Sequence, residues 1–476
     1  MTEATSAMGA ARGGVVDSDR GFLGHPRGLA YLAFTEAWER FSYYGMQTLL
    51  VLYMVNQLLL PGHIGKIAGF AGFRAALERV YGGPLSVVAL SSAIFGLYTG
   101  LVYLTPIAGG IIADRWLGRT RTITTGGLLM AAGHFLMAFD ASFLIALACL
   151  LTGVGCFKGN LASQVGELYR AGDPRRADAF QIYYLFINAS VIATPLVVGT
   201  LGELYGWHYG FGAAGVGMVI GLIIYRSGRR WLPAEPGRPR DVTAAWPRES
   251  VAARLRLARS ERAALIVLIL LLPVLAIGAV GNQQIFNAYM LWAPSHIDLV
   301  FFGRTMPTTW LITVDAVLSF AALVAAMAFW RLWGRRFGEP AEVTKITLGL
   351  FISAAALLTL AVASQLAASG HKAAVGWALA FHAMNSIGYA NIFPVGLALY
   401  TRASPKALAG TVLGLYFLHL FVANNLVGWL GGLLEVLTGT QFWLLHAGLV
   451  GGAGVVFLIA RQLFGHLLAP TDNGAP

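Results

Sequence analysis

Cysteine and charge are both scarce in this chain. Among 476 residues there are two cysteines, Cys149 and Cys156, and charged residues make up only 12%. Seven positions on one expected helix place the two cysteines about 10.5 Å apart along the axis, too far for a disulfide. No His, Cys and Asp grouping has the spacing of a metal site or of a nucleophile with its base. We therefore expect no metal, no organic cofactor and no enzyme activity.

Hydrophobic residues fill the sequence instead. They account for 57% of the chain, the mean hydropathy is +0.67, and they recur in runs of about 20 residues, the length that crosses a bilayer. The 58 glycines suit helices that approach each other closely in lipid. A water-soluble core could not use this much apolar surface, so the composition predicts an all-α integral membrane protein.

Runs long enough to span a bilayer occur twelve times. The predicted spans are 28–60, 85–112, 120–139, 142–169, 179–202, 207–228, 263–292, 308–333, 343–368, 373–401, 406–437 and 441–466. A Pro- and Arg-rich segment separates the first six from the last six. This predicts an N-terminal tail (1–27), a six-helix bundle (28–228), a linker (229–262), a second six-helix bundle (263–466) and a C-terminal tail (467–476).

The basic residues are unevenly distributed over this topology. All but seven of the 33 lie on the side that holds both termini, so the positive-inside rule predicts that both termini are cytoplasmic. We expect a multi-pass protein of the plasma membrane, or of the inner membrane if it is bacterial, without a removable signal peptide. Topology and anionic headgroups account for the net charge of +11. The expected partners are the lipid bilayer and a small molecule, with no nucleic acid, and we expect a monomer.

The first span carries charges that a membrane helix tolerates poorly. Glu36, Glu39 and Arg40 lie inside it, and each such charge costs roughly 2.5–3.5 kcal/mol at the membrane centre unless it is paired and faces the protein interior. Glu36 and Arg40 are four residues apart, and Tyr43 and Tyr44 lie within about a turn of Arg40. These residues predict a buried charged and aromatic face. The alternative is a structural ion pair that locks two helices together.

The same residues form a family signature. Glu36-x-x-Glu39-Arg40-Phe41-x-Tyr43-Tyr44-Gly45 matches the first-helix motif of the proton-coupled oligopeptide transporters (POT family) of the major facilitator superfamily, which the chain resembles along nearly its whole length. Further segments that resemble the family are Gly96-Leu97-Tyr98, Val102-Tyr103-Leu104-Thr105-Pro106, Ala113-Asp114-Arg115-x-x-Gly118-Arg119-x-Arg121, Gly153-x-Gly155-x-x-Lys158-x-Asn160, Gly166-Glu167-Leu168-Tyr169 and Tyr184-x-x-Ile187-Asn188.

The resemblance implies a major facilitator fold and the import of di- or tripeptides with protons by alternating access. The charges themselves suggest how coupling arises. Arg40 and Lys158 are the Lys and Arg residues that lie well inside the first six spans, away from the span ends, and Glu36 and Glu39 can neutralise them. A substrate carboxylate that takes Arg40 or Lys158 would free a glutamate to accept a proton. For Asp114, Arg115, Arg119 and Arg121 we expect a gating or helix-tethering role.

The second half departs from the family pattern. The glutamate usual in the seventh span is replaced by Asn282, and the one usual in the tenth span, which holds the peptide amine in the family, is replaced by Tyr389. Asp315 in the eighth span is a new carboxylate, and an ionisable residue within a span suggests function. The alternative is a hydrated residue near an outer vestibule.

These changes leave the substrate open. A di- or tripeptide is favoured, and an organic anion without a free α-amine is the alternative; a receptor that lost transport would have lost Glu36, Glu39 or Lys158. Lone histidines (His134, His382, His419 and His446) are expected to be structural, with His419 the one to test. The expected substrate-binding residues are Arg40, Tyr43, Tyr44, Tyr103, Lys158, Asn188, Asn282, Gln283, Trp310, Asp315, Tyr389, Asn391, Phe393, Tyr416 and His419.

Overall fold

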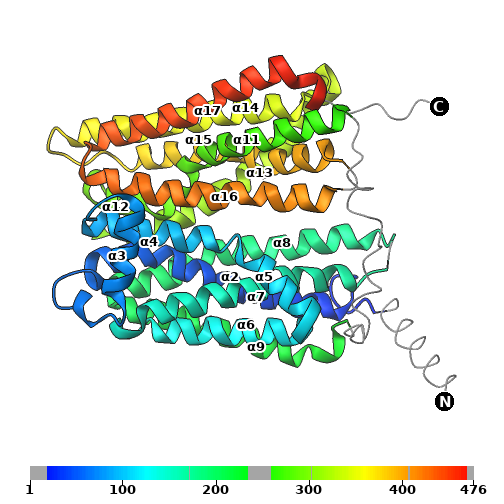
Figure 1. Ribbon diagram of the computed structural model, residues 1–476, viewed down its shortest axis with the longest axis horizontal. Helices are drawn as coiled ribbons and strands as arrows, with labels where there is room; N and C mark the ends of the chain where they lie inside the picture. The colour runs from blue at the N-terminus through cyan, green and yellow to red at the C-terminus, as the bar shows by residue number, and fades with distance from the viewer. Residues whose placement is uncertain (1–18, 171, 234–258, 302, 406–407, 469–476) are drawn as a thin grey trace. The chain divides into compact units, whose positions relative to one another are not determined.

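The computed structural model of the chain is almost entirely helical (Figure 1). It describes residues 19–170, 172–233, 259–301, 303–405 and 408–468. The predicted linker at 229–262 is described only near its two ends, and residues 1–18 and 469–476 of the two tails lie outside the described residues. A helix or an interrupted helix covers each of the twelve predicted spans. Nine helical stretches of the described chain are long and apolar enough to cross a membrane.

The chain divides into two compact units, and each is described by itself. Unit 1 is Met1–Leu49, Pro61–Phe70 and Leu104–Arg240. Its helices are α2 (Arg27–Tyr53, which ends beyond the unit), α5 (Thr105–Ile112), α6 (Arg119–Leu136), α7 (Phe143–Glu167), α8 (Arg175–Thr194) and α9 (Trp207–Ser227). Short 3-10 or π-helical turns lie at Ile64–Lys66, Ala113–Leu117, Asp140–Ser142, Pro195–Gly199, Leu201–Tyr205 and Arg229–Trp231.

Unit 2 is Leu50–Leu60, Ala71–Tyr103 and Asp241–Pro476. Its helices are α3 (Phe70–Tyr81), α4 (Val87–Leu101), α11 (Arg259–Gln283), α12 (Ala288–His296), α13 (Trp310–Phe337), α14 (Glu342–Ala367), α15 (Gly376–Ala403), α16 (Ala409–Gly431) and α17 (Gly439–Leu468). Shorter turns lie at Met54–Leu58, Gln284–Phe286 and Gly432–Glu435, and β1 (Val300–Phe301) pairs antiparallel with β2 (Arg304–Thr305). The predicted division into two six-helix bundles stays a prediction.

Glycine allows the helices of unit 1 to touch through their backbones. A Cβ atom on Gly109 of α5 would lie 2.0 Å from the carbonyl oxygen of Gly155 on α7. A Cβ atom on Gly126 of α6 would lie 2.7 Å from the carbonyl oxygen of Gly153 on α7. Any larger residue would push α5 or α6 away from α7. This packing positions α7, which carries Lys158.

The seventh predicted span is interrupted rather than continuous. α11 ends at Gln283, a 3-10 turn follows at Gln284–Phe286, and Asn287 is non-helical before α12 begins. The amide of Gln284 donates to the carbonyl of Val427 at 3.3 Å, and its Oε1 accepts from the backbone N–H of Ala288 at 3.2 Å. The side chain of Gln284 therefore caps the second half of the span and attaches the break to α16.

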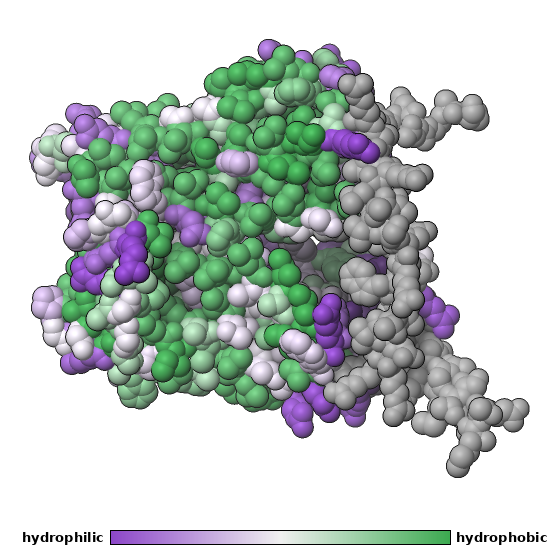
Figure 2. Space-filling model, viewed as in Figure 1, coloured by the Kyte–Doolittle hydropathy of each residue, from purple (hydrophilic) through white to green (hydrophobic). Residues whose placement is uncertain are grey.

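The exposed sides of the helices are apolar. Figure 2 shows hydrophobic side chains along the middle of the helices and hydrophilic ones gathered toward the helix ends. Leu128, Ile223 and Leu270 are large apolar residues that are more than half exposed. Such a band is what hydrocarbon requires of a membrane-spanning surface.

Candidate functional site

Three buried charges on α2 form the centre of unit 1. The Arg40 guanidinium donates to Glu36 Oε1 through Nε at 2.8 Å and through Nη2 at 2.7 Å. Arg40 Nε also lies 3.3 Å from Glu39 Oε2. All three residues are buried. One cation thus serves two carboxylates, which leaves an excess of negative charge unless a second cation lies nearby.

Lys158 on α7 is that second cation. Its Nζ lies 5.8 Å from the centroid of the Tyr43 ring, and Lys158 interacts electrostatically with Arg40, Glu39 and Glu36. The cluster therefore contains two acids and two bases, and its formal charge is balanced. Because two helices contribute the cations, each carboxylate has more than one partner available.

Aromatic hydroxyls surround the cluster. The rings of Tyr43 and Tyr44 meet edge to face, with centroids 5.2 Å apart, and Tyr44 interacts with Arg40. Tyr183 on α8 lies beside Glu36 and was not singled out from the sequence. Asn188, which was, donates from Nδ2 to the carbonyl of Tyr184 on its own helix at 2.8 Å.

Hydrogen bonds to neighbouring helices hold α2 in place. Ser42 Oγ lies 2.7 Å from His134 Nε2 on α6, and Ser190 Oγ on α8 donates to the carbonyl of Ala37 at 2.5 Å. The Asn160 amide on α7 donates to the carbonyl of Gly109 on α5 at 3.3 Å. These bonds fix α2 and α7 relative to their neighbours, so the charges meet in a defined geometry.

The four predicted gating residues have different surroundings. Arg119 at the start of α6 forms an ion pair with Glu167 at the end of α7. Gly118, at φ 77°, makes the turn between Asp114, Arg115 and α6. Asp114, Arg115 and Arg121 are exposed. The structure therefore gives a helix-joining contact to Arg119, with Glu167 as the partner that sequence reasoning did not assign.

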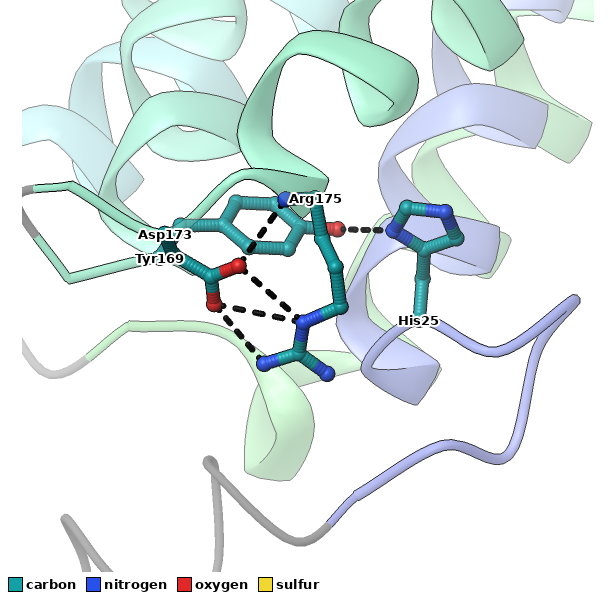
Figure 3. A network of polar contacts seen from close by, with 4 residues as sticks. All are labelled: His25, Tyr169, Asp173 and Arg175. Atoms are coloured by element: carbon teal, nitrogen blue, oxygen red, sulfur yellow. Dashed lines mark hydrogen bonds and ion pairs between the residues drawn. The ribbon is translucent and has the colours of Figure 1, made fainter.

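A further polar network of unit 1 attaches the segment before α2 to the connection between α7 and α8 (Figure 3). His25 Nδ1 lies 2.9 Å from the Tyr169 hydroxyl. Arg175 donates to Asp173 from Nε at 3.2 Å and from Nη2 at 2.8 Å. These bonds hold the pKa of the Asp173 carboxyl below its usual range. Arg175 also lies over the Tyr169 ring, 5.9 Å from its centroid.

In unit 2 the structure brings several predicted substrate residues together as an aromatic cluster. Tyr389 and Phe393 stack with centroids 5.8 Å apart, and the Tyr416 hydroxyl donates to the Phe393 carbonyl at 2.6 Å. The His419 ring lies 4.7 Å from that of Tyr416. Tyr103 packs with Tyr389 and Phe393 against the buried residues Ala276, Ala279, Leu420 and Ala423. Tyr416 and His419 are buried in this cluster, whereas Tyr103, Tyr389 and Phe393 are partly exposed.

Asp315 lies in a second group, with a partner that the sequence did not indicate. Its Oδ1 is 3.0 Å from His382 Nδ1 on α15, and the other ring nitrogen of His382 is 3.0 Å from the Tyr289 hydroxyl on α12. His382 had been interpreted as one of several structural histidines. Sixty-seven residues separate it from Asp315, so the spacing of residues along one helix could not predict this contact.

Asn391 lies in a third part of unit 2. Its Oδ1 accepts from Trp330 Nε1 at 2.6 Å, and both residues line a cavity of about 500 Å³ between α13, α14 and α15. The walls of this cavity are otherwise mostly apolar, with Ala326, Trp333 and Leu348 among them. The remaining predicted residues lie at helix ends: Asn282 and Gln283 close α11, and Trp310 begins α13.

The helices are apolar on their exposed sides and hold buried ion pairs, as in an integral membrane protein, and the solved structures give the class as a transporter of the major facilitator type. A crystal structure of the peptide transporter POT with sulfate matches with a TM-score of 0.81 and 26% identity, over 96% of this chain and 99% of that one. The predicted fold class is thereby confirmed. A mutant of the peptide transporter POT in complex with alafosfalin matches with a TM-score of 0.79 and 28% identity, over 95% of this chain and 98% of that one.

The chain belongs to the POT family, whose family model matches residues 120–259 and 241–444. It is 29% identical to the peptide transporter YePEPT of Yersinia enterocolitica subsp. palearctica, over 87% of this chain and 89% of that protein. It is 28% identical to the di-/tripeptide transporter of Lactococcus lactis subsp. cremoris, over 94% and 97%. The family is one of transporters, so the chain is a transporter and not an enzyme.

Proposed function

We propose that this protein is a proton-coupled symporter that imports di- and tripeptides or peptide-like molecules by alternating access. We place it in the plasma membrane as a monomer with both termini in the cytoplasm. The observation that carries the proposal is the balanced charge cluster of unit 1, in which Arg40 contacts both Glu36 and Glu39 while Lys158 lies close by. The names of the Yersinia and Lactococcus relatives support peptides as substrates.

Charge balance explains how the cluster couples the two solutes. The empty cluster is neutral, because two glutamates face two cations. A substrate carboxylate that binds Arg40 or Lys158 adds one negative charge to a buried site, which is unfavourable. A proton on Glu36 or Glu39 restores neutrality. Each ligand therefore strengthens the binding of the other, which is the thermodynamic requirement for symport.

The membrane potential can drive this cycle. A zwitterionic peptide carried with one proton moves one positive charge inward, which yields roughly 2.3 kcal/mol per 100 mV, enough for about 50-fold accumulation. Alternating access is the general transport mode of secondary transporters of this class. We assign Arg119 with Glu167 to the contacts that change during the cycle, and Asp114, Arg115 and Arg121 to the same region.

We also propose that the second half of the binding site is atypical of the family. Asn282 and Tyr389 stand where the family has glutamates, and neither supplies a charge for a peptide amine. The aromatic cluster of Tyr103, Tyr389, Phe393, Tyr416 and His419 supports contact with substrate side chains through ring faces. Asp315 is the carboxylate that remains for an ammonium group. The residues proposed as substrate contacts for mutagenesis also include Trp310, Asn188, Gln283 and Asn391.

The alternative substrate is an organic anion without a free amine. It would use Arg40 and Lys158 in the same way and would leave Asp315 unused. A receptor without transport is the least favoured reading, because the coupling charges Glu36, Glu39, Arg40 and Lys158 are all present.

Uptake by proteoliposomes tests the proposal. We expect a labelled dipeptide to accumulate when the interior is alkaline and negative, and we expect a proton ionophore to abolish the accumulation. Competition by unlabelled dipeptides, N-acetylated dipeptides and monocarboxylates then separates peptides from other anions. Accumulation that ignores the ionophore would contradict coupling. Competition by monocarboxylates alone would contradict a peptide substrate.

A further inference from the structure

The cavity between α13, α14 and α15 is an apolar groove, and all three helices contribute to its walls. It has a volume of about 500 Å³, and none of the described residues that line it is charged. The lining includes Phe329 of α13, Leu348 of α14 and Ile387 of α15, each at least 44% exposed. The Asn391 amide, which also lines the groove, is bonded at both ends, to Trp330 Nε1 and to the Ile387 carbonyl. Exposed apolar walls of this kind favour hydrocarbon over water as the occupant.

The length of the groove matches one leaflet of a bilayer. Its lining residues on α13 follow a helical stripe that runs from Ala322 through Ala326 and Trp330 to Trp333. The rise from the first to the last of them is about 16 Å, close to half of the roughly 30 Å that the hydrocarbon core of a bilayer measures. An acyl chain of one leaflet therefore fits along the groove.

Aromatic side chains gather at one end of the stripe. The rings of Trp333 and Phe337 lie with their centroids 4.7 Å apart. Trp330 is fixed on two sides, by its bond to Asn391 and by Lys345 Nζ, which lies 5.2 Å from its ring centroid. Tryptophan is enriched at the level of the lipid headgroups. The wall is thus built before any ligand arrives, and its aromatic end marks where a headgroup lies.

The same end of α13 carries positive charge that no carboxylate neutralises. Residues 331–345 contain four basic residues and two glutamates. Glu339 pairs with Lys345, and Glu342 pairs with Arg402. Three arginines of this segment are exposed and have no carboxylate within ion-pair distance among the described residues: Arg331, Arg335 and Arg336. The headgroup end of the groove therefore attracts an anion.

Arg336 is the arginine on the groove side of α13. It follows Trp333 by three residues and so continues the lining stripe by one turn, and its guanidinium lies 5.5 Å from the centroid of the Phe337 ring. α14 begins at the same end, with Thr344 in the groove wall, and a helix N-terminus favours a phosphate. Arg331 precedes Trp333 by two residues and lies on the other side of α13.

We propose that this groove is a binding site for a phospholipid with a net negative headgroup. One acyl chain lies along residues 322–333 of α13, and the phosphate lies at Arg336 and the start of α14. On the topology proposed above, the lipid belongs to the cytoplasmic leaflet. A zwitterionic lipid fits the groove with the same chain but carries its own cation beside the phosphate, so it binds less tightly. The lipid site does not depend on which substrate is transported.

Native mass spectrometry of the whole protein tests the groove. The protein is equilibrated in detergent with equal amounts of dioleoyl phosphatidylglycerol and dioleoyl phosphatidylcholine, and the bound lipids are counted as the collision energy rises. We expect one phosphatidylglycerol to stay bound to the wild type and to be lost from Ala326→Trp, which fills the groove. Leu348→Trp, from another wall, should act in the same way. Ala328→Trp is the matched control, because Ala328 is an exposed alanine of α13 outside the groove lining.

The controls decide between a groove site and general lipid contact. Unfolding temperatures show that each variant is folded. No retained phosphatidylglycerol in the wild type, or equal retention by the wild type, Ala326→Trp and Leu348→Trp, would overturn the site. Loss of Ala-Ala binding in Ala326→Trp while the lipid stays bound would give the groove to the peptide and would also overturn it. Groove-dependent lipid binding in a protein that binds no peptide would contradict the proposed function alone.

Arg336→Gln tests the headgroup end. This variant should still retain a lipid, but the preference for phosphatidylglycerol over phosphatidylcholine should be lost. Arg331→Gln removes the same charge from the other side of α13 and should keep the preference. A preference that is unchanged in Arg336→Gln, or lost equally in both variants, would overturn the assignment of the phosphate to Arg336.

Discussion

Units 1 and 2 hold their buried charges in different ways. Unit 1 places two carboxylates beside two basic side chains, Arg40 on α2 and Lys158 on α7, so its formal charges balance. In the described part of unit 2 the buried carboxylate is Asp315, which lies 3.0 Å from the His382 imidazole. The first arrangement is a cluster of ion pairs, and the second is a hydrogen-bonded chain that continues from Asp315 through His382 to the Tyr289 hydroxyl. The difference teaches that the two units use unlike electrostatics to stabilise their buried carboxylates.

The largest expected effect comes from removing a cation of unit 1. Lys158→Ala should abolish gradient-driven uptake while some downhill exchange remains, because one carboxylate then lacks its alternative partner. Proteoliposome uptake with and without a proton gradient measures both activities. Lys345→Ala is the matched control, since Lys345 is also buried but pairs with Glu339 in unit 2. Normal uphill uptake by Lys158→Ala would contradict coupling through the charge cluster of unit 1.

Arg40→Ala should weaken the binding of every substrate that carries a carboxylate. Loss of a charged hydrogen bond is worth about 1.5–3 kcal/mol, or roughly 10- to 100-fold in affinity. A C-terminally amidated dipeptide provides the control, because its affinity should change far less. If the acid and the amide lose affinity equally, Arg40 supports the structure of unit 1 rather than the carboxylate.

Asp315→Asn tests the opposite end of the substrate. For a ligand with an ammonium group, the substitution should cost about 1.5–3 kcal/mol in affinity, since a charge-assisted bond is lost. For an N-acetylated ligand it should be nearly silent. Binding of both ligands to both proteins gives the comparison. If Asp315→Asn keeps a strong preference for the free amine, then Asp315 does not bind the amine, and Tyr389, Asn391 or Asn282 is the next residue to test.

The smallest expected effect comes from removing the hydrogen bond between Trp330 and Asn391, which tests whether Asn391 belongs to the binding site in unit 2. Trp330→Phe removes the bond to Asn391 Oδ1 at the cavity between α13, α14 and α15. We expect a loss of about 0.5–1.5 kcal/mol in stability, seen as a lower unfolding temperature, with unchanged peptide affinity. If Asn391→Ala alters peptide affinity while Trp330→Phe does not, Asn391 contacts the substrate.

Local spacing and composition predicted much of the fold and part of the site. Apolar runs located the helices because bilayer thickness fixes their length. The Glu36 to Arg40 contact followed from helical geometry, since residues four apart lie on one face. Both inferences use only neighbours in sequence.

Long-range contacts were beyond such reasoning. Lys158 reaches the ring of Tyr43 across more than a hundred residues, and it was grouped with the first span only because isolated buried charges need partners. Nothing in the sequence joined His382 to Asp315 or Gln284 to Val427. Asn391 was grouped with Tyr389 through the motif of the tenth span, and its bond to Trp330 was not predicted.

Proton movement driven by the peptide tests the central claim most directly. Proteoliposomes that contain a pH-sensitive dye receive an external dipeptide with no initial pH gradient, and the membrane potential is clamped at zero. The account predicts acidification of the interior by the wild-type protein, and none by Glu39→Gln even where that variant still exchanges peptide. Peptide entry without acidification in the wild type, or acidification that persists in both Glu39→Gln and Glu36→Gln, would contradict coupling through the charge cluster of unit 1.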